Sequence, residues 1–73
     1  MNAKDAVAMR IIELCESNNT NINELARNIN VTPSTIYSMT NSKSMNPGVV
    51  SLQKICDGLG ISLKEFFNSP LFD

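Results

Sequence analysis

Histidine is absent from the 73-residue sequence, and only two cysteines occur, Cys15 and Cys56. Two cysteines at this separation, with no histidine, do not form a metal-ligand spacing. The serines and threonines lack an obvious base partner that would make one of them a nucleophile. Glu13 and Glu16 lie on the solvent side of a helix, which indicates a solvated charge cluster. No glycine-rich phosphate loop occurs. We therefore expect no enzymatic activity, no metal and no cofactor.

Long apolar runs are also missing. No stretch approaches the roughly 20 residues of a membrane span, and no secretory signal pattern opens the chain. We therefore expect a cytoplasmic protein without a membrane partner. A chain of 73 residues suits one domain over 1–73, and an apolar content of 42% favours a folded helical core over disorder. We predict that both cysteines are free buried thiols. A disulfide is the alternative, and it would be unusual in a reducing compartment.

Acidic residues are absent from one long window. Between Leu25 and Cys56 there is no Asp or Glu, whereas Arg27, Lys43 and Lys54 all lie there. All seven acids fall outside this window, and the formal net charge is −1. A face of one sign attracts a polyanion even when the whole molecule is slightly acidic. Because three cations are few, we expect modest affinity and a shallow salt dependence for such a partner.

The acid-free window begins inside the first of two predicted helices that are joined by a tight turn, and it includes the whole of the second. The first runs over 22–29, where Asn21 is a good N-cap and Glu24 completes a pattern like a capping box. Asn30 suits a left-handed stop, because asparagine tolerates positive φ better than most residues. The apolar stripe of this helix consists of Leu25, Ala26 and Ile29.

The second helix of this pair is predicted over 33–40. Thr32 can cap its start, and Pro33 fits the first helical position, where a missing N–H costs nothing. Val31 and Ile36 can form a hydrophobic staple across that start. The inward residues are Ile36 and Met39, and the outer side carries Pro33, Ser34, Tyr37, Ser38 and Asn41. These outer groups include no acid, so they can hydrogen-bond to base edges or phosphates without repelling the DNA backbone.

Three further helices flank this pair, which makes the predicted fold all-α. The first spans 3–17, with Arg10 facing water and a core stripe of Val7, Ile11, Leu14 and Cys15, widened by Ala8 and Ile12. The fourth spans 49–59, with core positions Val49, Leu52, Ile55, Cys56 and Leu59, and Gly60 as its C-cap. The fifth begins after the capping box of Ser62 and Glu65 and runs over about 63–68.

The segment from Asn18 to Phe67 resembles the lambda-repressor-like regulators of the Cro/CI or XRE type. The resemblance lies in a small residue, Ala26, a turn residue four positions later, Asn30, and the apolar turn residue Val31. The inward positions Ile36 and Met39 match as well. The turn residue is more often glycine in that family. The resemblance implies a compact five-helix domain whose second and third helices form a helix-turn-helix.

The resemblance also implies a function. It points to a sequence-specific regulator of transcription that binds double-stranded DNA, a repressor of the phage or mobile-element type, with helix 33–40 in the major groove. The base-contact candidates are Pro33, Ser34, Tyr37 and Ser38. The phosphate-contact candidates are Asn21, Asn23, Thr32, Thr35, Asn41, Lys43, Ser44 and Asn46. The alternative is a protein-interaction module that keeps the fold without binding DNA.

All three phenylalanines lie in the last eight residues of the chain. One or two rings can enter a core of this size, and the others need a partner or the folded-back tail to cover them. Many relatives dimerise through a C-terminal apolar patch, so the resemblance implies a homodimer, at least on DNA. The interface candidates are Phe67, Leu71 and Phe72. A self-packed monomer is the alternative. No small-molecule ligand is evident from the sequence.

Overall fold

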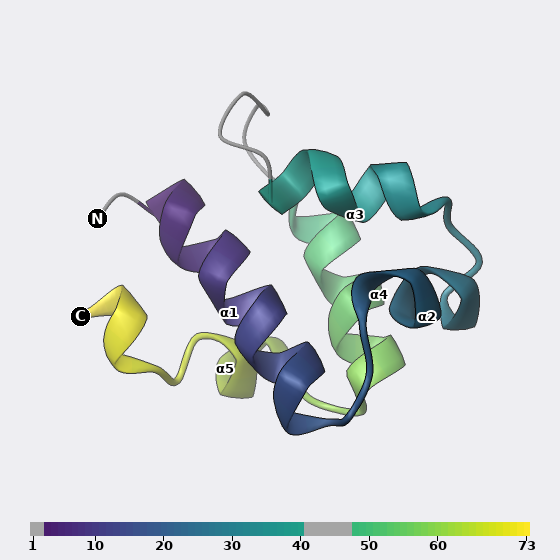
Figure 1. The fold of residues 1–73 in the computed structure, drawn as a ribbon. Helices are drawn as coiled ribbons and strands as arrows, with labels where there is room; N and C mark the ends of the chain where they lie inside the picture. Colours follow the sequence, from purple (N-terminus) through teal and green to yellow (C-terminus); the bar gives the residue numbers. More distant parts are fainter. Residues whose placement is uncertain (1–2, 41–47) are drawn as a thin grey trace.

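The helices follow one another in the order that the sequence predicts. The computed structural model describes the backbone of residues 3–40 and 48–73 and the side chains of residues 3–37 and 48–73. The helices are α1 (Ala3–Ser17), α2 (Ile22–Asn28), α3 (Pro33–Thr40), α4 (Val49–Leu59) and α5 (Leu63–Phe66), followed by a 3₁₀ turn, η1 (Pro70–Phe72). The described part of the chain contains no strand, which confirms the all-α prediction. In Figure 1, α1 runs between α3 on one side and the C-terminal turn on the other.

The turn between α2 and α3 forms as the sequence predicts. The side chain of Asn21 accepts a hydrogen bond from the Glu24 N–H at 2.9 Å, which caps the start of α2. After α2, Asn30 adopts a positive φ of 58°. The Val31 N–H then donates to the Ala26 carbonyl at 3.0 Å. These contacts reverse the chain, so that α3 starts at once at Pro33.

Each of the five helices contributes at least one fully buried side chain to a single core. The largest fully buried side chains are those of Phe66, Ile11, Leu25, Ile36, Ile55 and Cys56. Full burial of one large apolar side chain stabilises a fold by about 1.5–3 kcal/mol. Ala26, the small residue of the predicted motif, is 0% exposed, and its helix α2 is in contact with α3.

Gly58 lies where α4 approaches the end of α2. A Cβ atom built on Gly58 would lie 2.4 Å from Cγ2 of Ile29 and 3.0 Å from Cδ1 of Leu25. Real Cβ atoms essentially never approach another atom as closely as 2.4 Å, so the contact with Ile29 favours glycine at this position. The requirement comes from a contact between distant parts of the chain, so no local sequence pattern indicated it.

Two predicted core positions are wrong. Val49 is 69% exposed, and Ile12 is 44% exposed. Val49 lies in the first turn of α4, before Leu52, which is the first buried residue of that helix. Helical spacing identifies the buried face but not where along the helix the packing starts. On α1, Ile11 occupies the inward position, and Ile12 is rotated from it by about 100° toward solvent.

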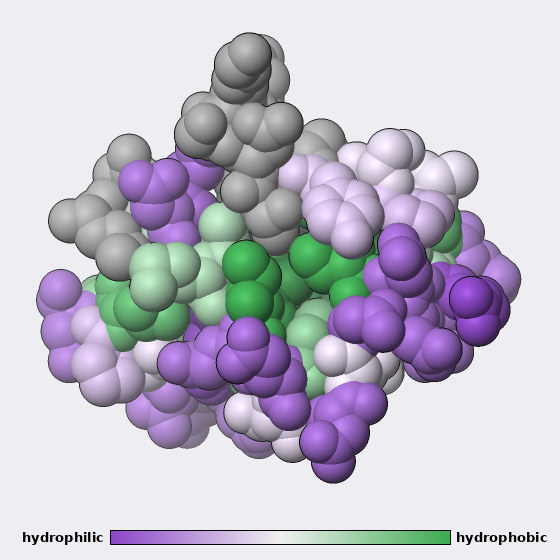
Figure 2. All heavy atoms as spheres, viewed as in Figure 1, coloured by the Kyte–Doolittle hydropathy of each residue, from purple (hydrophilic) through white to green (hydrophobic). Residues whose placement is uncertain are grey.

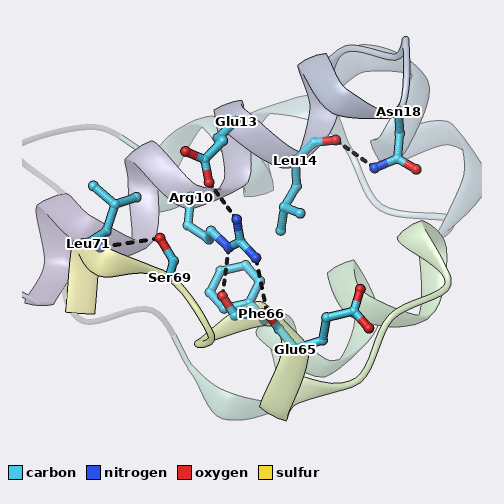
Figure 3. Close-up of polar contacts among 8 residues, drawn as sticks. All are labelled: Arg10, Glu13, Leu14, Asn18, Glu65, Phe66, Ser69 and Leu71. Atoms are coloured by element: carbon cyan, nitrogen blue, oxygen red, sulfur yellow. Dashed lines mark hydrogen bonds and ion pairs between the residues drawn. The ribbon is translucent and has the colours of Figure 1, made fainter. Parts of the chain in front are cut away.

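Arg10 does not face water, as the sequence predicted, but ties α1 to α5. Its side chain is only 13% exposed. Its Nε donates to the carbonyl of Phe66 at 2.7 Å, and a terminal nitrogen donates to the carbonyl of Glu65 at 3.0 Å (Figure 3). A second terminal nitrogen pairs with Glu13. The helix α5 ends at Phe66, two residues earlier than predicted, and Arg10 supplies a donor to the carbonyls of its last two residues.

Candidate functional site

One buried residue of α3 fixes which side of the helix faces solvent. Ile36 is 1% exposed and belongs to the core. The helices α1 and α2 both contact α3. Pro33, Ser34 and Tyr37 are exposed on the other side, and Tyr37 is 48% exposed. The structure therefore brings three of the four base-contact candidates together on one open surface. We call Pro33, Ser34 and Tyr37 the outer face of α3.

Three hydroxyl groups meet at the start of α3. The Thr32 Oγ1 lies 3.0 Å from the Ser34 Oγ and 3.0 Å from the Thr35 Oγ1. All three residues are exposed. The Thr35 N–H also donates to the Thr32 carbonyl at 3.0 Å. This local network gives the Ser34 hydroxyl a hydrogen-bond partner within its own segment.

The surface around α3 carries little charge. No Asp or Glu occurs among the described residues 25–37 and 48–56. In Figure 2, the described surface over α3 is pale and therefore weakly hydrophilic, whereas α2 at the right edge is deep purple. Arg27 lies 3.7 Å from Glu24, and both side chains are mostly exposed. An exposed pair of this kind is weak, so Arg27 keeps much of its attraction for an anion.

The phosphate-contact candidates at the start of α2 are exposed, but one of them is partly used. The Asn21 side-chain oxygen accepts from the Glu24 N–H, so its amide NH₂ is the group left to donate to a phosphate. Asn23 is exposed in the first turn of α2. Lys54 is exposed on α4 and lines a hollow together with Asn30. Lys54 lies in the acid-free window but was not among the predicted contacts.

Five candidate contacts lie outside the described side chains. Ser38 belongs to α3 by its backbone, but its side chain is not among those described. The other four follow α3 and precede α4, and they are Asn41, Lys43, Ser44 and Asn46. Their roles stay predictions from the sequence.

The C-terminal rings pack on one another. Phe66 is fully buried, Phe67 is 42% exposed, and Phe72 is half-buried against the core. The Phe67 ring meets the rings of Phe66 and Phe72 edge-on, with centroids 5.1 Å and 4.9 Å away. The tail thus folds back on the protein, and one ring keeps a large exposed area. Helical spacing did not indicate this arrangement, because η1 lies outside any regular helix.

An apolar hollow adjoins the folded-back tail. Half-buried Leu71 lines it together with Met9 and Ile12, which are 47% and 44% exposed. Glu13 and Glu16 also line this hollow. Met9 and Ile12 were not among the predicted interface residues, because their contact with η1 joins residues about 60 positions apart.

The two cysteines are buried and free, as predicted. Cys15 is 3% exposed and Cys56 is 0% exposed. Burial raises the pKa of both thiols, and the nearby Asp57 charge raises the pKa of Cys56 further. A raised pKa keeps each thiol protonated at neutral pH, and the thiol is a poor nucleophile and metal ligand. Both cysteines therefore act as small core residues.

Two further findings concern residues 3–40 and 48–73. Within them, no cluster of three or more His, Cys, Asp or Glu is arranged to hold a metal ion. None of the helices in these ranges combines the length and apolar character that crossing a membrane requires.

The sequence and the fold were compared with known proteins. A family model described as the Cro/C1-type helix-turn-helix DNA-binding domain matches residues 10–70. The crystal structure of the prophage Lp1 protein 11 is similar, with a TM-score of 0.88 and 29% sequence identity. The similarity covers 99% of this chain and 95% of that chain. No curated protein was found that matches the sequence.

Proposed function

The chain belongs to the Cro/C1-type helix-turn-helix DNA-binding family, and from this membership we propose that it is a sequence-specific regulator of transcription. In this proposal, α3 enters the major groove of double-stranded DNA, where a helix fits by its diameter. One observation carries it: the outer face of α3 is exposed and free of acids, while Ile36 on its inner side is buried.

We assign the contacts by their chemistry and position. Ser34 and Ser38 contact base edges, because a hydroxyl both donates and accepts. Pro33 and Tyr37 supply apolar and phenolic contacts beside them. The phosphate contacts are assigned to Asn21, Asn23, Thr32, Thr35, Asn41, Lys43, Ser44 and Asn46. Few of these groups are charged, so part of the specificity must come from DNA shape and bridging water.

We also propose a homodimer that reads a palindromic site, with half-sites about 10 base pairs apart. The exposed ring of Phe67 and the hollow beside Leu71 support an interface at the C-terminal end. Sedimentation at micromolar concentration tests the dimer. Wild type should sediment as a dimer or dimerise on the site, and Phe67→Ser should weaken that association. An unchanged Phe67→Ser dimer contradicts this interface.

The similarity to the prophage Lp1 protein 11 supports a phage or mobile-element origin, and repression is the regulatory sign we propose. Binding to DNA requires the protein to share a compartment with it, and we propose the cytoplasm. A reporter gene under the selected site tests the sign of regulation. Repression should lower its expression, and increased expression contradicts the proposal.

A salt titration with random-sequence duplex tests DNA binding itself. Log affinity should fall linearly with log salt, with a slope near two to three released counterions, because the acid-free window holds three cations. Binding that ignores salt, or no binding at low salt, contradicts the proposal. A protein-interaction module is then the better reading. That alternative is favoured by exposed apolar side chains at Tyr37, Val49 and Val50, which are 48%, 69% and 72% exposed.

A further inference from the structure

The Thr32 hydroxyl lies between two others at the start of α3. Its Oγ1 is 3.0 Å from the Ser34 Oγ and 3.0 Å from the Thr35 Oγ1. A hydroxyl carries one proton and two acceptor lone pairs. Thr32 can therefore donate to only one of these neighbours at a time. For both contacts to be hydrogen bonds, at least one neighbour must donate to Thr32.

A third partner at Thr32 decides where the Ser34 proton points. Phosphate oxygens only accept hydrogen bonds. When Thr32 donates its single proton to a phosphate, it has only lone pairs left for Ser34. Ser34 must then donate to Thr32 to keep their hydrogen bond. The outward side of the Ser34 hydroxyl is left with lone pairs alone.

We propose that Thr32 is a positioning residue that makes Ser34 read DNA as a hydrogen-bond acceptor. An unconstrained serine donates or accepts and therefore discriminates bases weakly. An accepting Ser34 favours a base with an amino group in the major groove, adenine N6 or cytosine N4. Guanine and thymine offer Ser34 only acceptors there, so they are disfavoured. This inference rests on the proposed function, because it needs α3 in the groove and a phosphate at Thr32.

The exposure of these residues supports a role in binding. Thr32, Ser34 and Thr35 are all exposed, so their hydroxyls contribute little to the core. One neutral hydrogen bond to a base discriminates about two- to tenfold. Removing the Thr32 hydroxyl should therefore reduce a base preference of about two- to tenfold to nearly none.

The test begins with selection of duplexes bound by the wild-type chain from a random pool. Ser34→Ala then identifies the base position that Ser34 reads. We expect adenine or cytosine at that position, preferred about two- to tenfold. Thr32→Val removes the hydroxyl at nearly constant shape and should abolish the same preference. Thr32→Ser keeps the hydroxyl and should keep the preference. The Thr32→Val/Ser34→Ala double variant should lose no more of this base preference than either single variant.

A base analogue tests whether the amino group of the preferred base is the group that Ser34 contacts. Replacing the preferred adenine by purine, or cytosine by 2-pyrimidinone, removes only the amino group. The affinity of the wild-type chain should be lower for this duplex than for the natural one by the full factor of its base preference. The affinity of Thr32→Val should be the same for both duplexes. Each result is a ratio of affinities measured on one protein, so a lower folded fraction in a variant cancels.

Three results overturn the inference while DNA binding stands: guanine or thymine is preferred at the Ser34 position, no base is preferred there, or Thr32→Val weakens all duplexes alike and keeps the preference. Failure of the proposed function is distinct, because the wild-type chain then shows no salt-dependent binding to any duplex.

Discussion

The outer face of α3 and the junction of α1 with α5 differ in what fixes their residues. At the junction, Phe66 is fully buried and Arg10 donates to two carbonyls, so the fold requires both. On the outer face, Ser34 and Tyr37 are exposed. Residues of the first kind should control stability, and residues of the second kind should control binding. Substitutions that separate the two properties test this division.

The largest loss of stability should come from Phe66→Ala. Removing a fully buried phenylalanine ring costs about 3–5 kcal/mol, which approaches the whole stability of a small domain. Chemical denaturation followed by circular dichroism measures the change. Phe67→Ala, which removes a ring that is 42% exposed, is the matched control and should cost much less. Equal losses in the two variants would remove the distinction between junction and surface.

Arg10→Met should have the next largest effect. Methionine keeps the apolar stem but removes the Arg10 donor from the Phe66 carbonyl and one of the donors from the Glu65 carbonyl, which still accepts from the Asn68 N–H at 3.2 Å. The expected cost is about 2 kcal/mol, since hydrogen bonds from a charged group are stronger than neutral ones. Glu13→Gln weakens only the ion pair with Arg10 and should lower the free energy of unfolding by less in the same experiment. An unchanged Arg10→Met midpoint would mean that the junction holds without this contact.

Gly58→Ala should cost about 1 kcal/mol. The new Cβ would clash with Ile29, which costs about 1–3 kcal/mol, and alanine recovers about 1 kcal/mol of helix propensity. The double variant with Ile29→Ala tests the cause, because the clash disappears with the Ile29 methyl group. In the Ile29→Ala background, Gly58→Ala should be neutral or stabilising. The same cost in both backgrounds would contradict a steric origin.

The smallest effect on stability should come from Ser34→Ala. An exposed hydroxyl away from the core changes the unfolding free energy by about 0.5 kcal/mol or less. The same variant should nevertheless lose base preference in a binding assay. A loss of stability comparable with that of Arg10→Met would show that the outer face also holds the fold together.

Local chemistry accounts for the parts that the sequence predicted well. The cap at Asn21, the positive φ at Asn30 and the left-handed Gly60 after α4 depend on neighbouring residues, so they can be read from short segments. The buried positions Leu25 and Ile36 follow from helical spacing. The outer face of α3 was found by the same spacing, as the side opposite Ile36.

Contacts between distant residues account for the parts that were missed. Arg10 and Phe66 are 56 positions apart, and no pattern in either segment indicates their hydrogen bond. The requirement for glycine at position 58 arises from Ile29 on another helix. Val49 has core spacing but lies beyond the packed length of α4. Spacing gives the direction of a side chain, and only the tertiary arrangement shows what lies there.

The most direct test of the central claim places one negative charge on each of two surfaces. Ser34→Glu puts a carboxylate on the outer face of α3, and Asn68→Glu puts the same charge on the exposed C-terminal side of α5. Binding to the selected duplex is measured for both variants at one salt concentration, with thermal unfolding in the same buffer. Ser34→Glu should weaken binding by at least about tenfold more than Asn68→Glu, with similar unfolding midpoints. Equal affinities in the two folded variants would contradict the claim that α3 faces the DNA.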